Sequence, residues 1–249
     1  MKLTVIGCAG TFPGPDSACS SYLLEHDGFR LLIDAGNGST GTLQRACGLL
    51  SIDAVLISHL HGDHYLDLVT YTYARRYHPT GRPECLPVYG PSDIKGHVAS
   101  AFGRPVDQLL REVYDFRPVP GPGDLEIGPF RLQLDRVNHP VETYGMRISD
   151  GTSTLAFSAD TGVSDELVEL ARGVDFFLCE ASYLDGDDNP PDVHLTGREA
   201  AEHAARAEVG RLVLTHLVPW GDRYRTLEEA KSAYDGRIDV ASSLDTFEI

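Results

Sequence analysis

The chain has 249 residues and a mass of 27.1 kDa, which is enough for one large α/β domain or two small ones. Its 21 Lys and Arg residues against 37 Asp and Glu residues give a formal net charge of −16, which argues against a general DNA- or RNA-binding protein because nucleic-acid phosphates would be repelled. No stretch approaches the roughly 18 consecutive apolar residues of a membrane helix, so we expect a soluble protein with no membrane partner.

Short apolar runs rich in β-branched residues predict buried strands at residues 3–6, 29–33, 54–57, 155–157, 174–178 and 212–214. Capping-box patterns predict helix starts at residues 196–199 and 226–229, and Gly173 and Gly236 are expected just after helix ends. Strands and helices alternate through both halves, which indicates α/β layers. We expect a single domain over residues 1–249, with the Pro/Gly-rich residues 117–124 as a surface loop.

The cysteines favour a reducing compartment. They are odd in number, scattered and never arranged as Cys-x-x-Cys, which argues against a disulfide framework and a structural zinc cluster: Cys8, Cys19, Cys47, Cys85 and Cys179. The apolar run near the N-terminus is too short for the core of a signal peptide. The expected location is therefore the cytoplasm.

The segment after the predicted strand 54–57 contains three imidazoles and one carboxylate within six positions: His59, His61, Asp63 and His64. Such a density of ligating side chains favours a metal site, with His59 and His61 facing one ion and the other two a second. The alternative is that Asp63 caps the following helix and the histidines are solvated, which explains only one residue. Imidazole and carboxylate without thiolate suit zinc, manganese or iron.

Further polar residues follow other predicted strands, namely His139, Asp160 and His216, while Asp34, Glu180 and His194 are placed similarly or just beyond. A lone Asp at a strand end is more often a turn or cap residue. The shared placement at carboxyl ends of strands, where α/β folds gather their sites, favours one joint site. The remaining histidines lack such a position and are expected at the surface: His26, His78, His97 and His203.

Several aromatic residues flank these segments in the sequence: Tyr65, Tyr71, Tyr73, Tyr77, Tyr183 and Trp220. Most of them are expected to pack in the interior, while one or two would stack on a planar base.

Together these residues resemble the metallo-β-lactamase superfamily over nearly the whole chain. The resemblance is carried by residues 31–36, the His-x-His-x-Asp-His segment, His139 and residues 158–162, 179–182, 194–196 and 214–217. Within the superfamily, Glu180-Ala-Ser and His194-Leu-Thr are similar to elements of the ribonuclease Z branch of phosphodiesterases, and the chain is similar to its atypical actinobacterial cyclic-nucleotide phosphodiesterases. The resemblance implies an αββα sandwich of two facing mixed β-sheets flanked by helices.

The resemblance also implies roles for the site residues. One divalent ion, with zinc favoured over manganese or iron, would be held by His59, His61, His139 and Asp160. A second would be held by Asp63, His64, His216 and the shared Asp160. Asp34 resembles the carboxylate that holds the metal loop in place. Glu180 and His194 resemble the pair that delivers a proton to the leaving oxygen.

The resemblance therefore implies a dinuclear phosphodiesterase that hydrolyses small cyclic nucleotides, with 3′,5′-cyclic AMP favoured. A hydroxide bridging the ions next to Asp63 and Asp160 would attack phosphorus, and His194 would protonate the departing oxygen. RNA is a disfavoured substrate because His139 and Asp160 are only 21 positions apart, which leaves no room for the long arm of transfer-RNA 3′-processing enzymes. DNA is not expected as a partner, and a homodimer stays open.

Three other functions remain as alternatives. The first is an RNA 3′-end endonuclease of ribonuclease Z type. The second is a metallo-hydrolase of lactones, thioesters or β-lactams, which is disfavoured because those reactions do not need the Glu180 and His194 pair to protonate a phosphoester oxygen. The third is a non-catalytic metal-binding or di-iron redox protein, against which the lack of a flavin-type phosphate loop argues.

Overall fold

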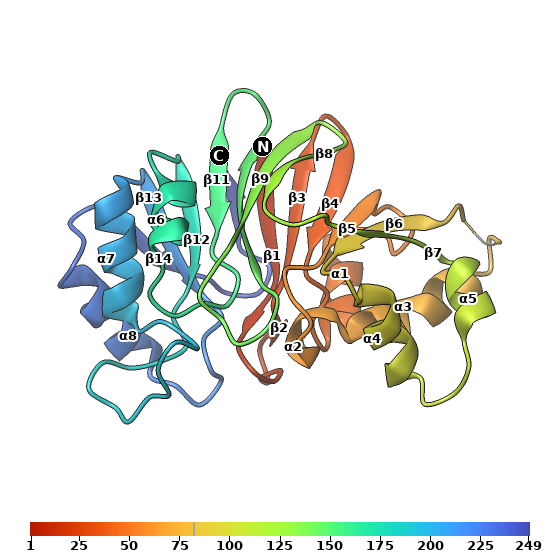
Figure 1. Cartoon of the computed structure of the whole chain (residues 1–249), viewed down its shortest axis with the longest axis horizontal. Helices are drawn as coiled ribbons and strands as arrows, with labels where there is room; N and C mark the ends of the chain where they lie inside the picture. The colour runs from red at the N-terminus through yellow and green to blue at the C-terminus, as the bar shows by residue number, and fades with distance from the viewer. Residues whose placement is uncertain (82) are drawn as a thin grey trace.

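The computed structural model describes residues 1–81 and 83–249. Two β-sheets pack face to face, and helices cover the outer side of each (Figure 1). This is the αββα sandwich that the resemblance implied. The two ends of the chain lie next to each other, and the amino group of Met1 donates to the carbonyl oxygen of Ile249 at 3.1 Å.

The first sheet has the strand order β15-β1-β3-β4-β5-β6-β7, with β2 paired to β1. Its strands are β1 (Lys2–Ala9), β2 (Ala18–Cys19), β3 (Ser21–His26), β4 (Phe29–Ile33), β5 (Ala54–Leu56), β6 (Leu86–Gly90), β7 (Tyr114–Pro118) and β15 (Thr246–Glu248). Beside it lie α1 (Ser39–Ala46), α2 (Gly62–Tyr65), α3 (Asp67–Arg76), α4 (Ile94–Ala101) and α5 (Asp107–Arg111).

The second sheet has the order β14-β13-β12-β11-β10-β9-β8. Its strands are β8 (Gly123–Ile127), β9 (Phe130–Arg136), β10 (Tyr144–Ser149), β11 (Thr154–Phe157), β12 (Phe176–Glu180), β13 (Arg211–Thr215) and β14 (Arg237–Val240). Its outer side carries α6 (Asp165–Ala171), α7 (Gly197–Ala207) and α8 (Arg223–Lys231).

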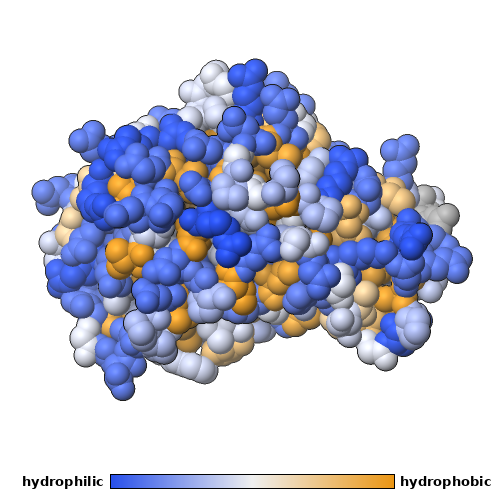
Figure 2. Space-filling view, in the orientation of Figure 1, coloured by the Kyte–Doolittle hydropathy of each residue, from blue (hydrophilic) through white to orange (hydrophobic). Residues whose placement is uncertain are grey.

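Alternating side chains of both sheets fill the space between them. Tyr22, Phe130, Met146 and Phe157 belong to this central core, and each is at most 2% exposed. Two further apolar layers join the sheets to their helices. On the face shown in Figure 2, hydrophilic residues predominate and hydrophobic ones show in small patches between them. None of the described helices has the length and hydrophobicity that a membrane span requires.

Strand direction decides where the polar strand ends meet. Strands β4 and β5 are parallel, as are β11, β12 and β13, and β9 runs the same way as β11 because both are antiparallel to β10. The carboxyl ends of these strands therefore point to one edge of the sandwich, where α2 lies at the bottom of Figure 1.

Several local predictions hold and others are wrong. Strand β4 has the predicted bounds, and Thr196 forms the predicted capping box with Glu199. The helix start predicted at residues 226–229 is wrong. Helix α8 already begins at Arg223, and its N-cap is Asp222, whose side chain accepts a hydrogen bond from the Arg225 amide. Gly236 is not a helix cap either, since α8 ends at Lys231. The strand expected at residues 174–178 lies two residues later, as β12.

The expectation that His203 lies at the surface is also wrong. Its side chain is buried on α7, where Nε2 accepts a hydrogen bond from the Ser164 amide at 3.1 Å and Nδ1–H donates to the Glu199 carbonyl at 2.7 Å. The alanines around it on α7 are small, so α6 approaches closely enough to cover the imidazole. His203 thus connects α7 to the amino end of α6.

Candidate metal centre

The loop after β5 carries the four residues of the His-x-His-x-Asp-His segment. His59 and His64 are fully buried, whereas His61 and Asp63 are partly exposed. Asp63 lies inside α2, and among the described residues no side chain caps either α2 or the following helix α3, whose N-cap residue is Leu66. The Asp63 Oδ2 instead accepts a hydrogen bond from the Thr11 amide at 2.8 Å. The interpretation of Asp63 as a simple helix cap is therefore wrong.

The first predicted ligand set comes together around one point. The ligand atoms of His59, His61, His139 and Asp160 all lie within 4.8 Å of one another. Nδ1 of His61 is 3.2 Å from Nε2 of His59 and 3.1 Å from Nε2 of His139. The Oδ2 of Asp160 is 3.5 Å from Nε2 of His59.

The second predicted set lies directly beside the first. The ligand atoms of Asp63, His64, Asp160 and His216 are also within 4.8 Å of one another. Nε2 of His216 is 3.2 Å from both Nε2 of His64 and Oδ2 of Asp63. Here Asp160 presents its other oxygen, Oδ1, at 3.2 Å from Nε2 of His64. Asp160 thus belongs to both sets through different oxygens.

These side chains fit divalent cations better than they fit one another. Imidazole nitrogens meet in pairs at 3.1–3.2 Å, although a neutral imidazole has only one N–H and several of these nitrogens already use theirs elsewhere. The buried Oδ1 of Asp160 has no hydrogen-bond partner among the described residues. An unpaired buried carboxylate oxygen facing imidazole nitrogens is typical of a metal site, and nitrogen and oxygen donors without thiolate suit zinc, manganese or iron.

Partners outside the two sets fix the orientation of the imidazoles. Nδ1–H of His64 donates to Asp34 at 2.7 Å, and Nδ1–H of His139 donates to the Val193 carbonyl at 2.9 Å. Nδ1 of His216 is hydrogen-bonded to the Ser182 hydroxyl at 2.7 Å. In each case Nε2 is left facing the centre, as metal-binding histidines require.

Asp34 also holds the metal loop itself. Its buried carboxylate accepts hydrogen bonds from the Ser58 amide at 2.7 Å and from the Ser58 hydroxyl at 2.9 Å. The sequence singled out Asp34, but it did not single out Thr11, Ser58 or Ser182. Their contribution is a backbone amide or a hydroxyl, and neither group carries a recognisable pattern in a sequence.

The chain turns abruptly where the strands enter the site. Asp34, Ala159 and His216 follow β4, β11 and β13, and their φ angles are 57°, 53° and 55°. Non-glycine residues seldom adopt this left-handed backbone, which is strained and concentrates at functional sites. The turns direct Asp34, Asp160 and His216 into the space between the sheet edges.

The pKa values of Asp160 and His59 are shifted in the directions expected for residues that bind a cation. Burial alone would raise the pKa of the Asp160 carboxyl, but the imidazoles of His216 and His64 hold it well below its usual value. Burial lowers the pKa of His59 well below the usual imidazole value, so this ring is neutral and free to act as a ligand. Asp160 is therefore a carboxylate within a ring of imidazoles.

Glu180 and His194 form a hydrogen-bonded pair next to the second set. Nδ1–H of His194 donates to Oε1 of Glu180 at 2.8 Å, and Oε1 also accepts from the Thr161 amide at 2.8 Å. Burial would lower the pKa of His194, but Glu180 raises it to about 9. The other described partners of Glu180 are the backbone amides of Thr161 and Ser182, so its carboxylate is held in place from three sides.

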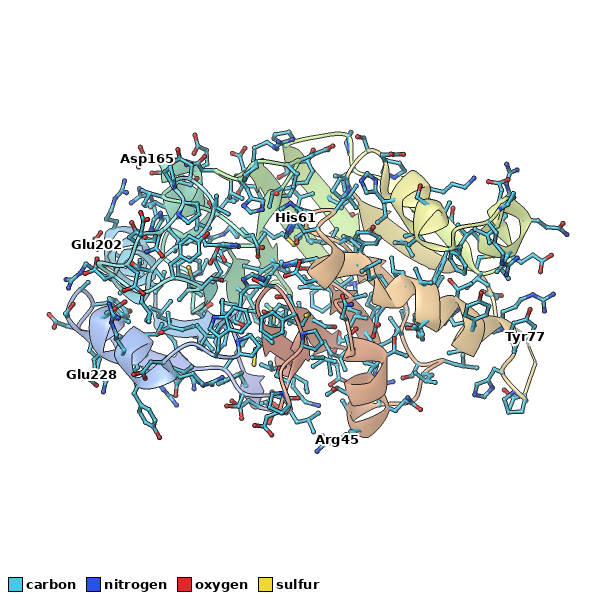
Figure 3. The ribbon with its side chains drawn as sticks, turned by 90° about the horizontal axis from the view of Figure 1, so that it is seen from below. Arg45, His61, Tyr77, Asp165, Glu202 and Glu228 are labelled. Atoms are coloured by element: carbon cyan, nitrogen blue, oxygen red, sulfur yellow. The ribbon has the colours of Figure 1, made fainter. Side chains whose placement is uncertain are left out.

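The site opens on one side of the molecule. The side chain of His194 is 13% exposed, and a cavity of about 250 Å³ adjoins it, lined by Val163, Tyr183 and Pro191 among others. Figure 3 views this edge of the sandwich. His61 lies there between the half that carries Arg45 and Tyr77 and the half that carries Asp165, Glu202 and Glu228.

Comparison with known proteins shows which proteins the chain resembles. A family model described as a β-lactamase superfamily domain matches residues 29–217. The chain is 42% identical to an uncharacterized protein of Mycobacterium tuberculosis, covering all of this chain and 92% of that protein. It is 31% identical to the probable metallo-hydrolase YhfI of Bacillus subtilis, covering 98% of each.

Two further comparisons extend this group. The crystal structure of YhfI superimposes with a TM-score of 0.88 over 99% of both chains, at 30% identity. A ribonuclease Z of Nocardia farcinica is 29% identical, covering 98% of this chain and 96% of that enzyme.

Proposed function

The chain belongs to the β-lactamase superfamily as a metal-dependent hydrolase of its ribonuclease Z-like branch, and from this premise we propose that it is a dinuclear phosphodiesterase acting on small cyclic nucleotides. The favoured substrate is 3′,5′-cyclic AMP. The observation that carries the proposal is the pairing of His194 with Glu180 beside two adjacent ligand sets that share Asp160.

The residues of the two sets are assigned to two divalent ions, with zinc favoured. His59, His61, His139 and Asp160 would hold one, and Asp63, His64, His216 and Asp160 the other. When bound, such ions activate a water molecule as the nucleophile and neutralise charge that develops on the phosphoryl oxygens. The chain itself orients the imidazoles through Asp34, the Val193 carbonyl and Ser182.

His194 is the group that donates a proton to the leaving oxygen. Glu180 binds Nδ1–H, which leaves Nε2 without a hydrogen-bond partner among the described residues in a side chain that is 13% exposed. Because Glu180 raises the pKa of His194, this imidazole carries the required proton near neutral pH. A ribose alkoxide is a poor leaving group and needs this proton, whereas an activated nitrophenolate does not.

The connection between His139 and Asp160 supports a small substrate. It consists only of β10, β11 and their short loops, so no arm extends from this part of the sheet. An acidic chain with a net charge of −16 and no such arm is poorly suited to hold a long RNA.

The proposal is tested with the zinc-loaded full chain on four substrates: cyclic AMP, bis(p-nitrophenyl) phosphate, a precursor transfer RNA and nitrocefin. We expect hydrolysis of the first two. Cleavage of the transfer RNA without hydrolysis of cyclic AMP would move the assignment to an RNA endonuclease. Hydrolysis of nitrocefin alone would move it to acyl substrates.

The variant His194→Ala tests the mechanism. It should keep its metal content but lose about 10²- to 10⁴-fold in turnover of cyclic AMP, and far less on bis(p-nitrophenyl) phosphate. The control is His97→Ala, which removes an exposed imidazole on α4 and should change neither rate. Equal losses on both substrates with metal content intact would refute the proton-donor role.

A further inference from the structure

An exposed aromatic pair lies on the loops that border the metal centre. Trp220 is the only tryptophan of the chain and is 81% exposed. The half-buried ring of Phe12 supports it, with a centroid separation of 4.5 Å and an interplanar angle of 37°. Among the described large hydrophobic side chains only Tyr224, at 84%, is more exposed, so most of the Trp220 ring is available to stack on a planar ligand.

The backbone ties this pair to the second ligand set. The Gly10 amide donates to the Leu217 carbonyl and the Leu217 amide to the Cys8 carbonyl, both at 3.0 Å, so the loops of Phe12 and Trp220 run together. Phe12 directly follows Thr11, whose amide donates to Asp63 at 2.8 Å. Trp220 comes four residues after His216. The pair is therefore held at a fixed position relative to both ligands.

The loops that carry the pair start at the second ligand set, which is partly open to solvent. In the second set the side chain of Asp63 is 12% exposed, whereas those of His64 and His216 are 0% and 2% exposed. The ring of His216 is also only 5.3 Å from that of His194, so the loop that leads to Trp220 starts beside the proposed proton donor.

We propose that Phe12 and Trp220 form a stacking platform for the nucleobase of the substrate. This inference rests on the proposed function, because it places the phosphate at the metal centre. Aromatic stacking uses the π-face that every base has and needs no charged group, which suits an acidic protein. The other candidate position for the base is the cavity beside His194, but among the residues lining it only Tyr183 is aromatic, and its ring is already edge-on to His194.

The single tryptophan provides a direct readout of binding. The zinc-loaded full chain is titrated with 5′-AMP, and in parallel with ribose 5-phosphate, which lacks the base. We expect 5′-AMP to change the emission of Trp220 in a saturable way and ribose 5-phosphate to leave it unchanged. No change with 5′-AMP, or an equal change with both, would overturn the platform. The platform would also be overturned if raising the protein concentration alone changed the Trp220 emission, because the pair would then be a contact between two copies of the chain.

The variant Trp220→Leu separates base binding from catalysis. We expect KM for cyclic AMP to rise roughly tenfold with kcat within about twofold, because stacking on one ring is lost while the metal centre is intact. Trimethylene cyclic phosphate, which has the same six-membered ring without sugar or base, should be hydrolysed as fast as by the wild type. The control Tyr77→Leu removes another exposed ring, 68% exposed, at the far end of the molecule and should change nothing (Figure 3).

Two outcomes contradict the platform. The first is that Trp220→Leu has the same KM as the wild type, whereas Val163→Trp, which fills the cavity beside His194, has a raised KM. The other is an equal loss in kcat on both cyclic phosphates, which would mean that Trp220 only supports the fold. Hydrolysis of cyclic AMP by the wild type decides the proposed function separately, so failure of the platform and failure of that function are distinguishable.

Discussion

Asp34 holds residues 58–64, the candidate metal loop, in place through hydrogen bonds. Two substitutions at Asp34 should have different effects on the stability of the fold and on the affinity for metal. The buried carboxylate accepts three hydrogen bonds, from the amide and hydroxyl of Ser58 and from Nδ1–H of His64. In Asp34→Ala all three donors lose their acceptor. Each unsatisfied buried donor costs about 1–3 kcal/mol, so we expect the metal-free protein to lose about 3–9 kcal/mol of unfolding free energy.

Asp34→Asn is the informative companion variant. Asparagine tolerates the left-handed backbone at this position, where φ is 57°, and its amide oxygen can still accept from Ser58. Its NH₂ group cannot accept from His64, so Nδ1 of His64 must give up its proton and Nε2 must carry it. That proton faces the ligand set. We therefore expect a fold of nearly normal stability with a 10- to 100-fold weaker affinity for zinc.

Both quantities can be measured on the same preparations. Urea unfolding in the presence of a chelator gives the stability, and competition with a chromophoric zinc chelator gives the affinity. Asp53→Asn removes the same charge from an exposed position and should match the wild type in both assays. An Asp34→Asn protein that binds zinc as tightly as the wild type would refute the assignment of Asp34 to the support of His64.

Three further predictions concern other parts of the chain. Asp160→Ala should be depleted of both ions in metal analysis, since each ligand set loses a carboxylate oxygen, and full occupancy would contradict the shared role. Gly36→Ala should destabilise the protein by about 1–3 kcal/mol because its Cβ would lie 2.0 Å from the Asp63 carbonyl, whereas Gly41→Ala, on the open side of α1, should be neutral or stabilising in the same urea assay. Burial lowers the pKa of His203, so its imidazole is neutral in the folded protein and takes up a proton in the unfolded chain below about pH 6.5. As the pH is lowered from 7 to 5, the unfolding free energy of the wild type should therefore fall more steeply than that of His203→Gln, by up to about 1.4 kcal/mol per pH unit. Parallel curves of unfolding free energy against pH would contradict this.

The convergence of the candidate ligand residues could be predicted because their chemistry and their position both show in the sequence. His59, His61 and His64 stand close together, and Asp160 and His216 follow short apolar runs that form β11 and β13. Parallel strands bring such ends to one edge, so the convergence follows from the fold. The pairing of His194 with Glu180 is not local, and only the family resemblance suggested it.

Other features required the three-dimensional structure. The platform residue Phe12 lies in a loop without a recognisable pattern, and its position depends on backbone hydrogen bonds to Leu217. His203 looks like a surface residue in an amphipathic helix, yet small alanines around it allow α6 to cover it. Short edge strands such as β14 and β15 carry too few residues to show a period.

The central claim is that two adjacent cation sites share Asp160. Anomalous diffraction at the zinc absorption edge, from a crystal of the zinc-loaded chain, tests it most directly. We predict two peaks, one among His59, His61 and His139 and one among Asp63, His64 and His216, with Asp160 between them. A single peak, or peaks that lie away from these residues, would contradict it.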